Sequence, residues 1–126
     1  MPEIVSNTTP LISLLKIDKI NLLKELFGTV SIPKAVFKEL EQGKEKPFYQ
    51  DINKTDWIKI VEIKNKQIKS FLFDLDEGEA EAIVLAQEIN AGLLLLDEKL
   101  GRLYAEKLNI KITGTIGILL KAKEKG

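Results

Sequence analysis

The sequence predicts an α/β domain with a mainly parallel sheet, and three observations support this prediction. Short β-prone runs alternate with helix-forming segments, an order typical of α/β domains. The run from Leu93 to Leu96 has no polar alternation, as expected for a parallel strand that is covered on both faces. The 126 residues suffice for one hydrophobic core and are too few for two. We therefore expect residues 1–126 to form a single domain.

The first half of the chain is predicted to begin with a strand over residues 3–6 that runs straight into a helix. Pro10 suits the first position of this helix, with Thr9 as its N-cap. Asp18 is placed like the N-cap of a second helix, which ends before Gly28. The elements expected next are a strand over 29–32, a helix over 33–43, a loop or weak helix over 43–56 and an edge strand over 57–63.

The second half contains the clearest helix pattern of the chain, which runs from Asp76 to about Asn90 and has Gly92 just beyond it. A short helix over residues 66–74 is predicted before it. The buried strand over 93–96 follows and closes at Asp97. The remaining expected elements are a helix over 98–108, a strand over 110–113 and a helix over 115–123.

The composition excludes several classes of chemistry. The chain has no Cys and no His, which excludes disulfides, thiol nucleophiles, zinc-finger sites and imidazole bases. The nineteen acidic and nineteen basic residues cancel, so the net charge shows no excess of positive charge of the kind that favours DNA binding. No apolar run approaches the about 20 residues of a membrane span, and the N-terminus lacks the apolar stretch of a signal peptide. We expect a cytoplasmic protein with no membrane partner.

Polar residues fall at the carboxyl ends of three predicted strands, where open parallel sheets bind their ligands. Asn7 ends the first strand, Asp97 ends the strand over 93–96, and Thr113 and Thr115 lie where the last strand meets the last helix. Two of these residues have an alternative interpretation. Asp97 suits an N-cap for the helix that follows it, a role that can coexist with a site, and Asn7 suits a turn residue bonded to its own backbone.

Two glutamates stand out by their positions on predicted helices. Glu79 falls on an inward-facing stripe, although it also fits a capping box that begins at Asp76. Glu39 lies at the border of an apolar stripe, where it faces either solvent or the edge of the sheet. The other acids of the later helix are predicted to lie on a solvated flank: Glu77, Glu81 and Glu88.

Asn7, Glu39, Glu79 and Asp97 all belong near one end of the predicted sheet, and three of them are acidic. Because His and Cys are absent, such a cluster of oxygen ligands selects hard cations such as Mg²⁺ or Mn²⁺. These ions keep some of their waters and take phosphate oxygens as further partners. The sequence therefore predicts phosphodiester chemistry.

Four segments resemble a branch of the PIN-domain proteins in their order and spacing. They are IVSNTTPLISLLKI, SIPKAVFKEL, LDEGEAEAIVLAQEINAGLLLLDEKLGRLYAEKL and IKITGTIGILLKAKEKG. Glu79 and Asp97 are 18 positions apart, which matches the third and fourth acidic positions of small PIN domains. The resemblance covers nearly the whole chain apart from the middle around residues 43–71.

This resemblance implies a PIN-like three-layer α/β/α fold of the nuclease kind, with a metal-dependent ribonuclease site at the carboxyl edge of the sheet. It matches Glu39, Glu79 and Asp97 to the second, third and fourth acidic residues of the family, whereas Asn7 stands where most members have Asp. An amide oxygen binds Mg²⁺ without adding negative charge, so the affinity for the ion should drop and a second ion has less support. Small single-domain members also imply a homodimer and a toxin that is paired with an antitoxin protein.

The expected reaction is endonucleolytic hydrolysis of single-stranded RNA. The four ligands would hold one or two Mg²⁺ or Mn²⁺ ions, which orient a water for in-line attack on a phosphodiester. Thr113 or Thr115 would position that water or a phosphate, and Glu98 is an acidic neighbour that would supplement the last ligand. Lys99 and Arg102 are candidates for phosphate contact, with ordinary exposed helix charges as the alternative.

Other interpretations stay open. A PIN-like domain that has lost catalysis through Asn7 would bind RNA or a protein without cleaving anything. A nucleotide-binding enzyme on a doubly wound sheet would need a G-x-G-x-x-G loop after the first strand, whereas only a weak G-x-x-G is present over residues 114–117. A phosphoaspartyl receiver would need acidic residues where the chain has Ser6 and Asn7.

Overall fold

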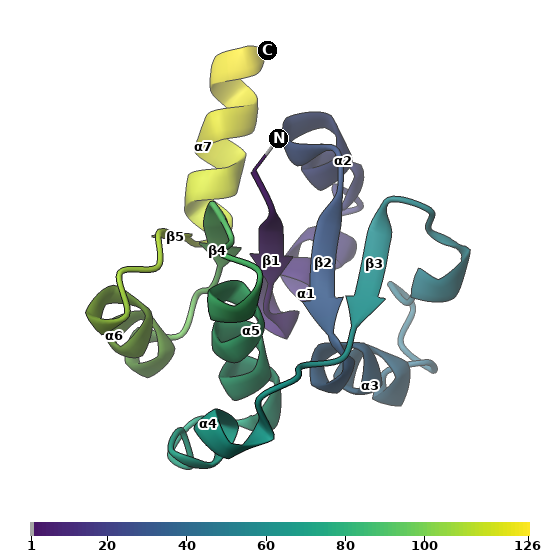
Figure 1. Ribbon diagram of the computed structural model, residues 1–126. Coiled ribbons are helices and arrows are strands. Elements are labelled where there is room, and N and C mark those ends of the chain that lie inside the picture. The colour runs from purple at the N-terminus through teal and green to yellow at the C-terminus, as the bar shows by residue number, and fades with distance from the viewer. Residues whose placement is uncertain (1) are drawn as a thin grey trace.

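The computed structural model describes residues 2–126 and contains a five-stranded parallel sheet (Figure 1). The strands are β1 (Ile4–Ser6), β2 (Val30–Pro33), β3 (Ile58–Val61), β4 (Leu93–Leu95) and β5 (Ile112–Thr113), in the spatial order β3-β2-β1-β4-β5. Every neighbouring pair runs parallel, with Val5 beside both Ser31 and Leu94. The predicted α/β class with a parallel sheet is confirmed, and β3 is an edge strand as expected.

Helices cover both faces of the sheet. They are α1 (Thr8–Lys16), α2 (Asn21–Phe27), α3 (Lys34–Gln42), α4 (Lys66–Ser70), α5 (Glu77–Glu88), α6 (Lys99–Lys107) and α7 (Thr115–Lys125), with a 3₁₀ helix η1 (Ile52–Lys54) before β3. The side chains of α1, α2 and α7 pack on one face, and those of α5 and α6 pack on the other. This confirms the three-layer α/β/α arrangement. No helix within residues 2–126 is both long and apolar enough to cross a membrane.

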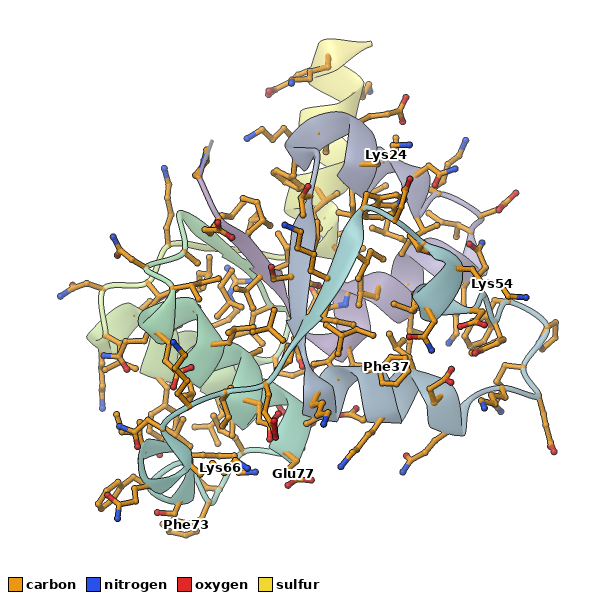
Figure 2. The ribbon with its side chains drawn as sticks, turned by 45° about the vertical axis from the view of Figure 1, so that its right-hand side comes forward. Lys24, Phe37, Lys54, Lys66, Phe73 and Glu77 are labelled. Atoms are coloured by element: carbon orange, nitrogen blue, oxygen red, sulfur yellow. The ribbon has the colours of Figure 1, made fainter. Side chains whose placement is uncertain are left out.

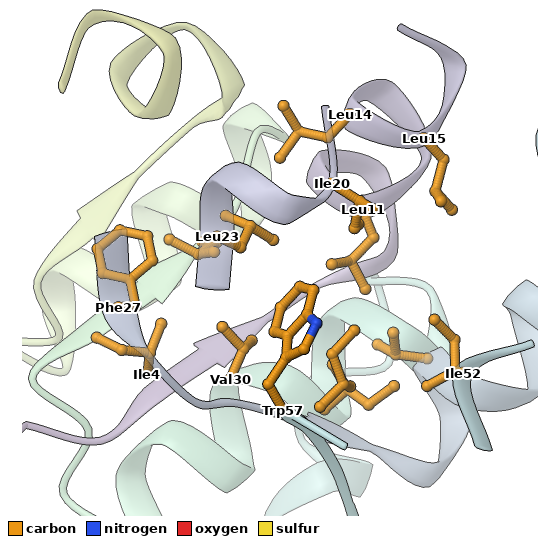
Figure 3. Close-up of a cluster of buried hydrophobic side chains, with 14 of the residues drawn as sticks. Ile4, Leu11, Leu14, Leu15, Ile20, Leu23, Phe27, Val30, Ile52 and Trp57 are labelled. Carbon is orange, nitrogen blue, oxygen red and sulfur yellow. The ribbon is translucent and has the colours of Figure 1, made fainter. Parts of the chain in front are cut away.

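Alternate residues of β1 and β4 contribute to two hydrophobic cores, because successive side chains of a strand point to opposite faces. Ile4 and Leu95 belong to the core under α1, α2 and α7, whereas Val5 and Leu94 belong to the core under α5 and α6. Figure 3 shows the first of these cores, in which Trp57 lies among side chains from α1, α2 and the strands. The leucines of α1 and α2 are therefore used mainly in packing against the sheet.

Asp18 has a different role from the one predicted. It ends α1 instead of starting α2, because it adopts the left-handed conformation with a φ of 56°. Its N–H donates to the carbonyl of Leu15 at 3.0 Å, and the N–H of Lys19 donates to the carbonyl of Leu14 at 2.8 Å. These two hydrogen bonds form a Schellman motif, and Asp is one of the few residues that tolerate the left-handed conformation that this motif requires. Helix α2 consequently begins at Asn21.

The chain reverses the direction of strand addition between β1 and β4. β2 and β3 are added on one side of β1, and the chain then crosses over to add β4 and β5 on the other side. In open α/β sheets, ligands bind outside the carboxyl ends of the strands at such a topological switch point. Asn7 directly follows β1, and Asp97 lies just beyond β4. The fold therefore brings both residues to the place where a ligand is expected.

Candidate active site at the carboxyl edge of the sheet

Asn7 lies between β1 and the first turn of α1. Its backbone N–H donates to the carbonyl of Leu95 at 2.9 Å, which continues the pairing of β1 with β4. The residue is only 2% exposed, yet its side chain forms no capping bond and Oδ1 has no hydrogen-bond partner within residues 2–126. The alternative of a turn residue bonded to its own backbone is therefore wrong. A buried polar atom without a partner is costly, so it points to a ligand or a water that completes the site.

Glu39 reaches the same place from α3. A Cβ added to Gly78, in the first turn of α5, would overlap Oε1 of Glu39 and lie 3.3 Å from the hydroxyl of Thr8. The bare backbone of Gly78 thus lets α1, α3 and α5 meet around the Glu39 carboxyl. Burial raises the pKa of Glu39, and the nearby charge of Asp76 raises it further, while the neighbouring Thr8 hydroxyl and Gly78 amide oppose both effects. Of its two predicted orientations, Glu39 takes the one toward the sheet edge.

Glu79 lies at the start of α5 and is 7% exposed. Its backbone N–H donates to Oδ1 of Asp76 at 2.7 Å, as the predicted capping box requires. Oε2 of Glu79 is buried without a partner within residues 2–126, so the capping role leaves this oxygen free for a ligand. Burial, the Asp76 carboxyl and then the charge of Glu98 raise the pKa of Glu79 to about 7. The helix-capping and site interpretations of Glu79 therefore hold together.

Glu98 connects these acids back to α1. The hydroxyl of Thr9 donates to Oε1 of Glu98 at 2.6 Å, although the two residues are far apart in the sequence. Glu98 and Asp76 both act on the titration of Glu79, and Asp76 also acts on Glu39. We call Glu39, Asp76, Glu79 and Glu98 the carboxylate arc. Both ends of this arc contact the first turn of α1.

Asp97 lies at the same edge but is held by α7. Oδ1 accepts the backbone N–H of Thr115 at 2.7 Å, and Oδ2 accepts the Thr115 hydroxyl at 2.6 Å. A Cβ added to Gly114 would lie 2.5 Å from Oδ1, so the glycine makes room for this contact. The alternative of an N-cap for the next helix is wrong, because α6 begins at Lys99 and Glu98 occupies the cap position. Asp97 instead caps α7, a helix that is remote in the sequence.

Two of the predicted phosphate-contact residues lie beside these hydrogen bonds between Asp97 and Thr115, which we call the clasp. Arg102 lies against Gly114, with Nη1 3.5 Å from the position of an added Cβ, so it faces the start of α7. Thr113 ends β5, and its hydroxyl lies where a Cβ on Gly117 would be. Lys99 is exposed at the first position of α6. The structure thus brings Arg102 and Thr113 to the Asp97 side of the edge and leaves Lys99 open to solvent.

The oxygen donors at this edge are of the kind that Mg²⁺ and Mn²⁺ prefer. The unpartnered buried atoms Asn7 Oδ1, Thr8 Oγ1 and Glu79 Oε2 fit a hard cation, since each lacks a hydrogen-bond donor or acceptor within residues 2–126. In the same part of the chain, no three acidic side chains form a group that could hold a metal ion as they stand. The residues therefore supply suitable donors but not a preformed metal cage.

Glu81 was predicted to lie on the solvated flank of α5, and this is wrong. It is 9% exposed, because Oε1 accepts the backbone N–H of Ala35 at 3.0 Å and Oε2 pairs with Lys69 at 3.0 Å. Glu77 is exposed as predicted and pairs with the same lysine at 3.1 Å. Glu81 thus satisfies the first turn of α3, the helix that carries Glu39. Helical spacing alone did not reveal this role, because it says nothing of a neighbouring helix terminus.

Two further features of the edge were not predicted. Asp76 takes part in the carboxylate arc as well as capping α5, although its position before Glu79 gave a signal only for the cap. A hollow of about 180 Å³ lies beside the first turns of α3 and α5. Its basic lining residues are Lys34, Lys38, Lys66 and Lys69. Figure 2 shows Lys66 and Glu77 at this end of the molecule.

Comparison with known families matches the chain over almost its full length. The family model DUF3368, described as a PIN domain, matches residues 3–126. This range includes the sheet, the carboxylate arc and the clasp between Asp97 and Thr115. No curated protein matches the chain closely enough to count as a relative.

Proposed function

Because the chain belongs to the PIN-domain family, we propose that it is a metal-dependent endoribonuclease that hydrolyses single-stranded RNA. PIN domains are generally nucleases, and PIN nucleases typically use divalent metal ions. The observation that carries the proposal is the carboxylate arc at the switch point, beside which Asn7 Oδ1 and Glu79 Oε2 are buried without partners. These oxygens lie where the parallel strands end, at the topological switch point of the sheet.

In the proposed mechanism, Asn7, Glu39, Glu79 and Asp97 hold Mg²⁺ or Mn²⁺. The bound ion supplies an activated water and stabilises the charge that develops on the phosphate. Glu79 must lose its proton before it can act as a ligand, because a cation requires the carboxylate form. Asp97 can bind while it holds Thr115, since each carboxylate oxygen has a second lone pair.

The Thr115 hydroxyl and backbone N–H are already bonded to Asp97, so Thr115 acts in this proposal by fixing that carboxylate. Arg102 and Thr113 are positioned for a phosphate on the Asp97 side of the edge. Lys34 and Lys38 form no salt bridge within residues 2–126, and they line the hollow beside the first turns of α3 and α5, where Glu62, Glu77 and Glu81 are also lining residues. We propose that they and the exposed Lys99 contact RNA phosphates, which position a strand without reading its sequence.

Cleavage of labelled single-stranded RNA by the purified full chain with Mn²⁺ tests this proposal. We expect Asp97→Asn and Glu79→Gln to lose cleavage and Asn7→Asp to gain it, because the last variant restores a charged ligand. Glu106→Gln changes an exposed acid of α6 outside the site and serves as the matched control for contaminating nucleases. Equal cleavage by the wild type, Asp97→Asn and Glu79→Gln would contradict the proposal.

A second candidate is a PIN-like module that binds RNA or a protein without cleaving it. The neutral Asn7 favours this alternative, since it removes one of the charges that attract a cation. Its expected result is RNA retention without turnover in the wild type and in Asn7→Asp. The cleavage assay above therefore separates the two functions.

We also propose that, in the cell, this protein is the toxin of a toxin–antitoxin pair and that an antitoxin protein inhibits it. The support is the resemblance of the chain to small single-domain PIN proteins. Induced expression of the wild type should arrest the growth of a bacterial host, while Asp97→Asn should not. Growth arrest by both proteins would contradict a role through RNA cleavage.

A further inference from the structure

The feature that the proposed function leaves unexplained is the direction of the two acids that follow β4. Asp97 turns toward α7, where Thr115 engages both of its oxygens. Glu98 turns the other way, and the Thr9 hydroxyl in the first turn of α1 donates to its Oε1 at 2.6 Å. Adjacent residues thus serve opposite sides of the carboxyl edge.

Glu98 lies close to the end of β1, where Asn7 is a neutral ligand of the proposed site. Asn7, Thr8 and Thr9 follow one another at the end of β1, so the bond to Thr9 brings the Glu98 carboxylate to the strand end that carries the neutral Asn7. On its other side, Glu98 stands at the N-cap of α6, and a Cβ added to Gly101 in the first turn of that helix would lie 2.9 Å from Oε2 of Glu79. Glu98 therefore lies between Asn7, which β1 brings to the site, and Glu79, which α5 brings to it.

Unpartnered buried oxygens lie on both sides of this carboxylate. The residues Asn7 and Thr8 are 2% and 5% exposed, and Glu79 is 7% exposed, yet Asn7 Oδ1, Thr8 Oγ1 and Glu79 Oε2 have no partner within residues 2–126. A hydrogen-bond donor would satisfy one such oxygen, whereas a divalent cation satisfies several oxygens at once. The second oxygen of Glu98 makes no hydrogen bond within the same residues and is available to such a cation.

We propose that Glu98 is a cation-binding carboxylate of this site and supplies the negative charge that Asn7 lacks. This inference rests on the proposed metal-dependent function and adds a residue to it. Glu98 reaches across from the end of β4 to the end of β1, so it places a negative charge beside the strand end whose own ligand, Asn7, is a neutral amide.

The test is Mn²⁺ binding to the full chain by isothermal titration calorimetry, with circular dichroism to check folding. We expect Glu98→Gln to weaken Mn²⁺ binding on the order of tenfold to a hundredfold, the range seen when a metal site loses a supporting group. The Gln carbonyl oxygen can still accept the Thr9 hydroxyl, so the fold should be kept. In the double variant Asn7→Asp with Glu98→Gln, the charge is back at the end of β1, and we expect the affinity to return toward the wild-type value.

The control is Glu106→Gln, which changes an exposed acid on α6, the helix that Glu98 precedes. This variant should leave the Mn²⁺ affinity unchanged. Wild-type affinity in Glu98→Gln would overturn the role of Glu98 while leaving the proposed nuclease function standing. A weakened Glu98→Gln that Asn7→Asp does not rescue would overturn the replacement of one charge by the other. Failure of the wild type itself to bind Mn²⁺ would overturn the proposed function, and this inference with it.

Discussion

At the scale of single residues, the titration of Glu79 makes the stability of the protein depend on pH. The pKa of Glu79 is raised to about 7 because the side chain is buried and faces the Asp76 carboxyl. The folded state therefore binds a proton that the unfolded chain releases near pH 4.5, the ordinary value for Glu. Between these two pH values, the free energy of unfolding falls as the pH rises, and above about 7 this contribution is fully lost.

Glu79→Gln removes this titration while keeping the shape of the side chain. We expect the metal-free variant to be more stable than the wild type at pH 8 by about 1–2 kcal/mol, with the difference shrinking toward pH 5. Urea unfolding of both proteins at the two pH values measures it, with Glu106→Gln as an exposed control. A variant less stable than the wild type at pH 8 would show that burial of the charge is not the dominant cost.

Gly78 matters because of the space that it leaves. Alanine favours a helix by about 1 kcal/mol over glycine, so Gly78→Ala should fold well. Its Cβ would nevertheless overlap Oε1 of Glu39, and the flexible carboxylate would have to move. We expect RNA cleavage to fall on the order of tenfold to a hundredfold, because a small misplacement of a functional group has such effects.

The matched control for this variant is Gly43→Ala. A Cβ at Gly43 would meet its nearest neighbour at 3.5 Å, an ordinary contact at the end of α3. Cleavage and melting temperature of this control should stay near the wild-type values. Unchanged cleavage in Gly78→Ala would mean that the position of Glu39 does not limit the reaction.

The sequence could predict which residues reach the carboxyl edge, but not which way they turn there. Asn7, Glu79 and Asp97 were identified because strand ends and helical stripes follow from local patterns. The bond between Asp97 and Thr115 joins two elements, so no local pattern contains it. For the same reason the contact between Thr9 and Glu98 was not predicted.

At the scale of elements, Glu81 connects α5 to the first turn of α3. Its carboxylate accepts the N–H of Ala35 and pairs with Lys69. Glu81→Ala should lower the free energy of unfolding by about 1–3 kcal/mol, because it leaves a buried N–H without a partner. Glu77→Ala removes an exposed partner of the same lysine and should cost less than about 1 kcal/mol.

Chemical denaturation of these two variants gives the comparison, and Glu81→Gln adds a second control. The Gln carbonyl can still accept the Ala35 N–H, so Glu81→Gln should be more stable than Glu81→Ala. Equal stability of the three variants would show that Glu81 is no anchor for α3.

Element types were predictable because strands and helices differ in hydrophobic period, and the buried run at β4 was recognisable from its leucines alone. Element ends were less predictable, because they depend on contacts between elements. Helix α1 begins at Thr8 and not at Pro10, since Asn7 stays extended to pair with β4. β5 starts at Ile112, as only two residues of the predicted strand pair with β4.

At the scale of the whole molecule, apolar side chains remain exposed on the last two helices. Ile116 and Leu120, one helical turn apart on α7, are 70% and 58% exposed, and Leu100 and Leu103 are exposed on α6. We expect a homodimer that buries Ile116 and Leu120, because exposed apolar groups of this size favour association. Most leucines of α1 and α2 are not available for it, since they are packed in the core.

Light scattering coupled to size-exclusion chromatography tests this expectation. The double substitution Ile116→Lys with Leu120→Lys should convert the dimer to a monomer without loss of helical signal. Phe71→Lys with Phe73→Lys, which changes an exposed apolar pair in the turn after α4, should leave the dimer intact. A wild-type protein that elutes as a monomer would rule the dimer out.

The central position of β1 has a consequence for folding. β1 is far in the sequence from its neighbour β4 and from α7, the helix that Thr115 joins to Asp97. Strand pairs so distant in the chain close late in folding. Asn7 and Asp97 therefore come together only after β4 has docked beside β1, so the oxygen donors of the carboxyl edge assemble in the last steps of folding.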